Sequence, residues 1–173
     1  MEVLRAARSL GLPQWCIGAG AVRNVVWDRL HGIDRQAYPA TDVDVVYFDP
    51  DDTDPQRDRK LAQRLTSMAP AIDWEVVNQA GVHQWYGQVY GVEMAPLTST
   101  EDGLGTWPEI CSAVGVRLAA DDQLEVLAPF GLGDLFEMVV RHNTRLVPSE
   151  IYRRRIETKG WRERWPQLTV VDA

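Results

Sequence analysis

Residues 16–24, CIGAGAVRN, join a short apolar run to a helical pattern through a glycine-rich turn. The apolar run at 14–17 predicts a brief strand, and Gly18 and Gly20 predict that it ends there. From residue 21 onward the apolar side chains recur at the helical period, at Val22, Val25 and Leu30. A strand, a tight turn and a helix in this order let backbone N–H groups approach a phosphate closely. The segment therefore predicts an α/β arrangement with a phosphate-binding turn.

The rest of the chain alternates helical and extended patterns in the order expected for an α/β domain with a small mixed sheet. A polar loop is predicted at 33–41, and a hairpin at 116–118 and 124–127. We expect one domain over residues 1–173, with a helical C-terminal extension from about 134 to 173 packed on the core. The predicted helices cover 2–10, 21–30, a segment starting at Asp54-Pro55, 106–114, 134–142 and a segment from 149; further strands cover 42–50 and 71–79.

Composition and charge favour a globular protein and disfavour several other classes. The chain has 173 residues, 45% of them hydrophobic and 25% charged, which is ordinary for a globular domain. No apolar run is long enough to span a bilayer and no signal peptide is evident, so we expect a cytoplasmic protein whose Cys16 and Cys111 are buried, reduced thiols. The net charge of −7 disfavours binding of duplex nucleic acid, although residues 141–165 are rich in Arg and Lys.

The acidic residues carry the sharpest chemical signal. Asp42 and Asp44 are two residues apart at the start of a predicted strand, so their side chains leave the same face. Adjacent carboxylates repel each other unless a cation lies between them, and hard oxygen ligands favour Mg²⁺ or Mn²⁺. Glu75, in the later strand, supplies a third carboxylate if that strand pairs nearby. For the glycine turn to meet these acids, the strand from residue 42 must run antiparallel to the strand at 14–17.

A dinucleotide-binding fold is the alternative, because Gly18-x-Gly20-x-x-Asn24 follows a strand and opens a helix. Asn24 stands where that fingerprint has its third glycine, at the point where helix and strand pack closely. The acid that would bind the ribose, Asp49, lies further along the chain than the usual spacing of about 20 residues. The chain is also short for the two mononucleotide-binding halves of that fold.

The sequence resembles the polymerase-beta-type nucleotidyltransferase superfamily and, more closely, a bacterial family of small nucleotidyltransferase-like proteins. The resemblance covers most of the chain and implies a nucleotidyltransferase fold. Two departures stand out: the turn reads Gly-Ala-Gly rather than Gly-Ser or Gly-Gly, and the spacer from Gly20 to Asp42 is long. The matching blocks are IGAGAVRNVVWDRLHG (17–32), DVDVVYFD (42–49), WEVVNQAGVH (74–83), TWPEICSAVGVRL (106–118), LAPFGLGDLFEMVVRHN (127–143) and KGWRERWPQL (159–168).

The resemblance implies that Asp42 and Asp44 are the metal-binding acids, with Glu75 as the candidate third acid of the metal and catalytic site. It also implies that Gly18, Ala19 and Gly20 form the phosphate turn. Two Mg²⁺ or Mn²⁺ ions are expected together with a bound nucleoside triphosphate.

Further residues near these motifs are candidates for contacts with the substrates. Arg23 and Asn24, in the first helical turn, are candidates for contacts with the same phosphates. An arginine there opposes the helix dipole, so an anionic ligand explains its position better than helix stability does, and a surface arginine is the alternative. Asn78 and His83 are candidates for contacts with the ribose or the acceptor. Trp85-Tyr86 is the candidate aromatic pair for stacking on a base, whereas the other tryptophans are expected in the core. The basic residues at 153–155 and Lys159 either bind a polyanion or form a solvated helix face.

The predicted activity is the Mg²⁺-dependent transfer of a nucleoside monophosphate from a triphosphate to a hydroxyl acceptor, with release of pyrophosphate. The acceptor is left open among a small molecule, a protein side chain and an RNA end. A catalytically inactive module that binds a nucleotide or a partner on the same fold is the first alternative. An NAD-binding protein is the second.

Overall fold

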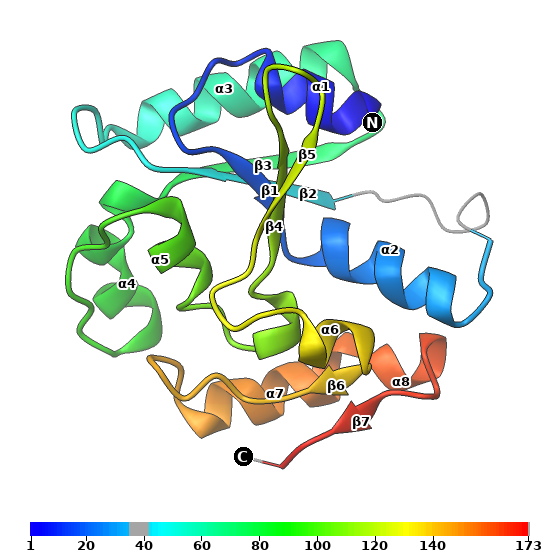
Figure 1. The fold of residues 1–173 in the computed structure, drawn as a ribbon. Coiled ribbons are helices and arrows are strands. Elements are labelled where there is room, and N and C mark those ends of the chain that lie inside the picture. Colours follow the sequence, from blue (N-terminus) through cyan, green and yellow to red (C-terminus); the bar gives the residue numbers. More distant parts are fainter. Residues whose placement is uncertain (35–41, 173) are drawn as a thin grey trace.

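The structure is a computed structural model that describes residues 1–34 and 42–172. Its centre is a five-stranded mixed sheet with the strand order β3-β2-β1-β4-β5 (Figure 1). β2 runs antiparallel to β1 and parallel to β3, and β4 runs antiparallel to β1 and to β5. The predicted small mixed sheet with a late hairpin is therefore confirmed. The strands are β1 (Cys16–Gly18), β2 (Asp42–Tyr47), β3 (Asp73–Asn78), β4 (Gly115–Leu118) and β5 (Leu124–Leu127).

Helices cover both faces of this sheet. Figure 1 shows α1 and α3 on one side of it, and α2 with the C-terminal elements on the other. A separate parallel pair, β6 (Val139–Val140) and β7 (Thr169–Val170), lies among the C-terminal helices. The helices are α1 (Glu2–Arg8), α2 (Gly20–Leu30), α3 (Pro55–Met68), α4 (His83–Tyr90), α5 (Thr100–Leu104), α6 (Gly133–Phe136), α7 (Ser149–Lys159) and α8 (Trp161–Arg164), with 3₁₀ turns at η1 (Gln79–Gly81) and η2 (Ile110–Ser112).

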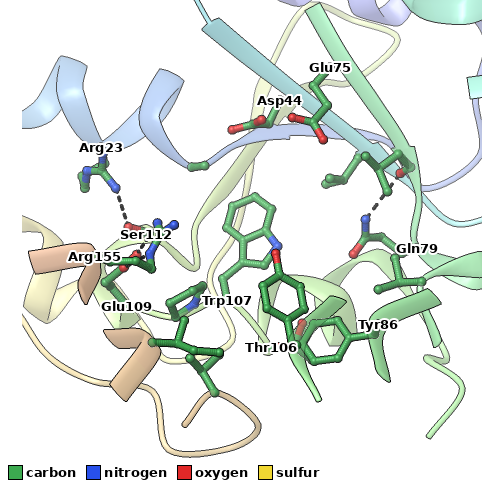
Figure 2. A pocket seen from close by; sticks show the side chains of 18 of the residues that line it. Arg23, Asp44, Glu75, Gln79, Tyr86, Thr106, Trp107, Glu109, Ser112 and Arg155 are labelled. Atoms are coloured by element: carbon green, nitrogen blue, oxygen red, sulfur yellow. Dashed lines mark hydrogen bonds and ion pairs between the residues drawn. The ribbon is translucent and has the colours of Figure 1, made fainter. Parts of the chain in front are cut away.

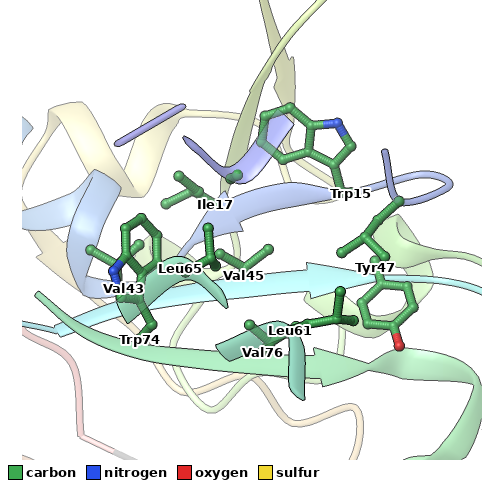
Figure 3. Packing of buried hydrophobic residues seen from close by; sticks show 11 residues of the cluster. Trp15, Ile17, Val43, Val45, Tyr47, Leu61, Leu65, Trp74 and Val76 are labelled. Atoms are coloured by element: carbon green, nitrogen blue, oxygen red, sulfur yellow. The ribbon is translucent and has the colours of Figure 1, made fainter. Parts of the chain in front are cut away.

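The side chains of β2 and β3 point alternately to the two faces of the sheet, one towards the core and one towards the candidate site. In β2 and β3 one set of alternating side chains is apolar and faces α1 and α3, and the other set includes Asp44 and Glu75. The apolar set forms a continuous buried cluster with these two helices. Because the two strands are held from behind by this core, the carboxylates on the opposite face are carried by a rigid support. Figure 3 shows the cluster, which includes Trp15, Ile17, Val43, Val45, Tyr47, Leu61, Leu65, Trp74 and Val76.

The predicted start of α3 is confirmed. The Asp54 side chain accepts a hydrogen bond of 2.9 Å from the backbone N–H of Gln56, and Pro55 occupies the first turn. An aspartate cap satisfies one of the N–H groups that a helix start leaves unpaired, and a proline there loses no hydrogen bond. The helical period of the sequence predicts a buried stripe of Leu61, Leu65 and Met68. Leu61 and Leu65 are buried, but Met68, the last residue of the helix, is 48% exposed.

A second core attaches the C-terminal elements to α2. Trp27 of α2 is fully buried and makes edge-to-face contacts with Trp161 and Trp165. Asp28, 1% exposed, accepts hydrogen bonds from the Arg164 guanidinium and from Nε1 of Trp165. The helix that begins at the glycine turn is therefore fixed along its buried side by α8 and the residues after it.

The predicted helix at 106–114 is wrong. Ser99 caps α5 instead, and the Thr106 hydroxyl donates to the carbonyl of Gly103, so that Thr106 closes a helix rather than opening one. The Asn143 amide then donates to the carbonyls of Gly105 and Trp107. These long-range bonds hold the chain outside a helix until the short turn η2, a case of tertiary contacts overriding local propensity.

The helix predicted at 134–142 is also wrong beyond its first turn. α6 ends at Phe136, and Met138 adopts a positive φ of 56° that a helix cannot contain. Val139 and Val140 then pair with β7. The C-terminal region therefore combines the helices α7 and α8 with a two-stranded parallel ribbon.

Three further predictions concern the loop at 33–41, the two cysteines and membrane-spanning segments. Most of the loop predicted at 33–41 lies outside the described residues. Cys16 and Cys111 are both free and buried, as expected. In the part of the chain that the structure describes, no helix is long and apolar enough to cross a bilayer.

Candidate functional site

The glycine turn forms one edge of the candidate site. β1 ends at Gly18, α2 begins at Gly20, and Ala19 between them adopts φ 49° and ψ −129°. A Cβ built on Gly18 would lie 2.5 Å from Cη2 of Trp107, so the indole ring packs where a larger residue would have its side chain. The turn is thus compressed between the sheet and Trp107, with the N-terminus of α2 directly after it.

The carboxylates lie in register with this turn. Gly18 of β1 pairs with Asp44 of β2, which in turn pairs with Glu75 of β3. The predicted antiparallel pairing of β1 and β2 is therefore confirmed, and it puts the acids beside the bend. Figure 2 shows the Asp44 and Glu75 side chains together at the upper rim of a cavity. Asp42 lies two residues earlier on β2 and is exposed.

The surroundings of Asp44 shift the pKa of its carboxyl group. Burial raises the pKa of Asp44 to about 6, and the carboxylates of Glu75 and Asp42 add to the rise. Arg23 and Lys159 oppose it by favouring the charged form. Across residues 1–34 and 42–172, no three or more His, Cys, Asp or Glu side chains are grouped in an arrangement that holds a metal ion. The site is therefore a pair of facing carboxylates with a third, exposed one nearby.

A cavity of about 290 Å³ lies in front of the carboxylate pair. Cationic and acidic side chains from α2, α7 and the segment before η2 line one side of it, and aromatic side chains of α4 line another (Figure 2). The lining residues are Ala19, Arg23, Asp44, Val45, Val46, Glu75, Val77, Gln79, Val82, Trp85, Tyr86, Tyr90, Thr106, Trp107, Pro108, Glu109, Ser112, Val147, Ile151 and Arg155.

Arg23 is buried beside the N-terminus of α2 and lines the cavity. It donates hydrogen bonds of 2.6 Å to the Ser112 hydroxyl and 3.0 Å to the Asn24 side-chain oxygen. Its guanidinium also lies over the rings of Trp27 and Trp161, at 5.1 Å and 4.5 Å from their centroids. Its Nε is buried without a hydrogen-bond partner among the described residues. Burial lowers the pKa of Arg23, as expected for a cation held away from water.

Glu109 and Arg155 form an ion pair on the same side of the cavity. Glu109 is 0% exposed, and it accepts hydrogen bonds of 2.5 Å from Nε and 3.3 Å from Nη2 of Arg155. Burial alone would lower the pKa of Arg155, but the bonds to Glu109 raise it, with contributions from Tyr90 and Asp44. Sequence reasoning singled out Arg155 within a basic run but missed Glu109. The two residues are far apart in the chain, and no local pattern marks the pair.

Asn78 does not line the cavity. Its side-chain oxygen accepts from the backbone N–H groups of Asp49 and Ala80, and its amide nitrogen donates to the carbonyls of Asp49 and Asp52. These four bonds use the whole capacity of an asparagine amide. Asn78 therefore fixes the loop that follows β2.

The other sequence candidates divide between cavity and support. His83, at the start of α4, is not among the cavity-lining residues, and its Nδ1 is buried without a partner in the described part of the chain. Asn24 acts on the cavity through its bond to Arg23. Trp85 and Tyr86 do line the cavity, on a helix that the sequence analysis did not predict.

The antiparallel β1–β2 pair separates this fold from the dinucleotide-binding class, whose first strands are parallel. The arrangement defines a different class: a mixed sheet that presents two carboxylates beside a glycine turn at a helix N-terminus. The model of a protein family described as nucleotidyltransferase matches residues 5–170. The chain belongs to this nucleotidyltransferase family.

Solved structures agree with this assignment. A protein whose NMR structure is described as revealing a CCA-adding enzyme head domain is 32% identical, with a TM-score of 0.83, and the match covers 100% of this chain and 89% of that one. A CCA-adding enzyme of Thermotoga maritima complexed with tRNA is 13% identical, with a TM-score of 0.55 over 99% of this chain and 38% of that one. A CCA-adding enzyme in complex with CTP is likewise 13% identical, with a TM-score of 0.55 over 99% and 39%.

The last two similarities show the fold alone, and the chain spans well under half the length of those two enzymes. A comparison with curated proteins gave no significant match.

Proposed function

We propose that this chain transfers a nucleoside monophosphate from a nucleoside triphosphate to an acceptor hydroxyl, in a divalent-metal-dependent reaction that releases pyrophosphate. The observation that supports the proposal most directly is the register of Gly18, Asp44 and Glu75 across three neighbouring strands. It brings a turn suited to phosphate and a carboxylate pair suited to a hard cation to one wall of one cavity.

The residues present fit a magnesium site. Asp44 has a raised pKa because it is half-buried near two other carboxylates, and a divalent cation would relieve that repulsion. Mg²⁺ is commonly held by one or two carboxylates, with substrate phosphates and water completing the shell. Asp44 and Glu75, with Asp42 nearby, would hold the metal, and it would supply charge neutralisation of the triphosphate and activation of the acceptor hydroxyl.

The remaining steps belong to the side chains and the backbone. The first N–H groups of α2 bind phosphate oxygens, as helix N-termini do. Arg23, which lines the cavity beside the N-terminus of α2, adds a buried positive charge that attracts the phosphates. Glu75 accepts the proton of the acceptor hydroxyl, directly or through a water molecule that it orients. Arg155, held by Glu109, stabilises negative charge that develops on the leaving pyrophosphate.

The test is transfer of label from α-³²P nucleoside triphosphates to fractions of a cell lysate, with Mg²⁺ or Mn²⁺ added. We expect one labelled acceptor, and no labelling by the Asp42→Asn/Asp44→Asn double variant. Asp51→Asn is the matched control, because Asp51 is an exposed acid in the loop after β2. Metal-dependent binding of a triphosphate with no transfer to any fraction would refute the enzyme and indicate a binding module on this fold.

A further inference from the structure

The face of α4 that borders the cavity is almost entirely aromatic. Trp85, Tyr86 and Tyr90 all line the cavity that contains Asp44 and Glu75. The ring centroids of Tyr86 and Tyr90 are 4.5 Å apart, and those of Trp85 and Tyr86 are 6.2 Å apart. The three rings therefore form one continuous aromatic surface rather than three isolated contacts.

Two of these rings are exposed although they are large and apolar. Trp85 is 39% exposed and Tyr90 is 42% exposed, while Tyr86 beneath them is 8% exposed. Tyr86 packs with Val82 and Leu97 and forms the base of the surface. Trp85 and Tyr90 are not part of the buried core. Their exposed ring faces can therefore contact a ligand in the cavity.

The charged side chains that line the cavity all come from elements other than α4. The cationic side chains that line it, Arg23 and Arg155, come from α2 and α7. The segment from η1 through α4 contributes no charged lining residue. It contributes instead the Gln79 amide, whose Nε2 makes one long bond of 3.4 Å to the carbonyl of Val77. A triphosphate suits the first wall, and an uncharged planar ring with polar edges suits the second.

We infer that the aromatic face of α4, formed by Trp85, Tyr86 and Tyr90, is a stacking site for a nucleobase. The inference rests on the proposed function, because it assumes that the phosphates lie at the N-terminus of α2. Bases stack on aromatic side chains whatever their sequence, since each base has a π-face. The base belongs either to the donor triphosphate or to an acceptor that carries a nucleoside, and both have the same stacking chemistry.

The test is isothermal titration with nucleoside triphosphates, the four free nucleosides and inorganic tripolyphosphate, each with Mg²⁺. The Trp85→Ala/Tyr90→Ala double variant should bind tripolyphosphate as the wild type does, because the phosphate wall is unchanged. If the base is that of the donor, this variant binds triphosphates at least about tenfold more weakly. If the base is that of the acceptor, triphosphate affinity stays unchanged and nucleoside affinity falls by that factor.

Two controls separate stacking from other effects. The Trp85→Phe/Tyr90→Phe variant keeps an aromatic ring at each position and should bind triphosphates and nucleosides within about threefold of the wild type. Phe136→Ala removes an aromatic ring that is 53% exposed and lies outside this cavity, and it should change no affinity. The inference is overturned if the alanine variant keeps both triphosphate and nucleoside affinities, or if it loses tripolyphosphate binding equally. These titrations need no turnover, so they fail independently of the transfer assay.

Discussion

Ala19 occupies a backbone conformation that glycine adopts far more readily. Its φ of 49° and ψ of −129° lie outside the regions that L-residues prefer, and such a residue costs on the order of 1–3 kcal/mol. Strain of this kind persists where the surrounding structure enforces it, and here β1 and α2 fix both sides of the turn. The resemblance to nucleotidyltransferases singled out this residue as a departure from Gly-Ser or Gly-Gly, and the structure shows that the departure is strained.

We therefore expect Ala19→Gly to stabilise the protein by about 1 kcal/mol, because the strain is relieved and only part of the gain is offset by chain entropy. Urea unfolding of the two proteins measures the difference. Ala21→Gly, in the first turn of α2, is the control, and we expect it to destabilise by about 0.5–1 kcal/mol. If both substitutions changed the free energy of unfolding in the same direction, the strain at residue 19 would be contradicted.

Asp44 makes stability depend on pH. Its pKa is raised to about 6 in the folded protein, against 3.8 for a free aspartate, so the folded state binds the proton more tightly than the unfolded state does. The resulting stability is present in full below pH 3.8 and is lost as the pH rises through about 6.

Asp44→Asn should consequently raise the free energy of unfolding at pH 7 by about 1–3 kcal/mol, measured in urea without divalent cations. The gain should shrink towards zero at pH 4, where the wild-type carboxyl is protonated. Asp51→Asn should give no gain at either pH. A gain for Asp44→Asn that is the same at pH 4 and pH 7 would show that the burial of a charged carboxylate near other carboxylates is not its cause.

At the scale of single residues, the sequence predicted the juxtaposition of those candidate residues that follow a local rule. Gly18, Asp44 and Glu75 follow from a turn signal and from strand alternation. Glu109 could not be found in this way, since its carboxylate acquires its role from an arginine in a distant helix. Asn78 resembled a ligand in the sequence because its four hydrogen bonds to the neighbouring loop and turn become visible only in three dimensions.

At the scale of elements, local pattern failed where a distant side chain replaces a local hydrogen bond. The sequence Thr106-Trp107-Pro108 is typical of a helix start, but Asn143 captures the carbonyls of Gly105 and Trp107. By contrast, α3 forms as predicted because Asp54 and Pro55 act within its own first turn. α4 was missed because a helix of eight residues, His83–Tyr90, gives little periodicity to detect.

The non-helical segment that carries Trp107 also explains the glycine at the end of β1. Gly18→Ala would put a Cβ against the Trp107 ring, and we expect a loss of about 1–3 kcal/mol from overpacking. Replacing Trp107 with Leu in the same protein should recover part of that loss. A double-mutant cycle in urea measures the recovery, and strict additivity of the two changes would mean that the ring and the turn do not interact.

At the scale of the whole molecule, α2 connects the candidate site to the C-terminal helices. Its N-terminal turn carries Arg23 into the cavity, and its middle carries Trp27 and Asp28 against α8. A buried acid, Asp28, forms part of this connection, and no local pattern in the sequence marks it. That acid lies on the helix that was expected to bind phosphate, and its partner is more than 130 residues away.

Asp28→Ala should therefore affect both stability and the site. It removes the buried carboxylate that accepts hydrogen bonds from the Arg164 guanidinium and from Nε1 of Trp165, and we expect a loss of about 1–3 kcal/mol in the free energy of unfolding. Asp134→Ala, which breaks the pair with the half-exposed Arg141, should cost less than about 1 kcal/mol. Because the Arg23 guanidinium lies over the ring of Trp161, the first residue of α8, loosening α8 should also weaken tripolyphosphate binding under conditions where the variant remains folded. Unchanged tripolyphosphate affinity in folded Asp28→Ala would mean that α8 supports the fold without positioning Arg23.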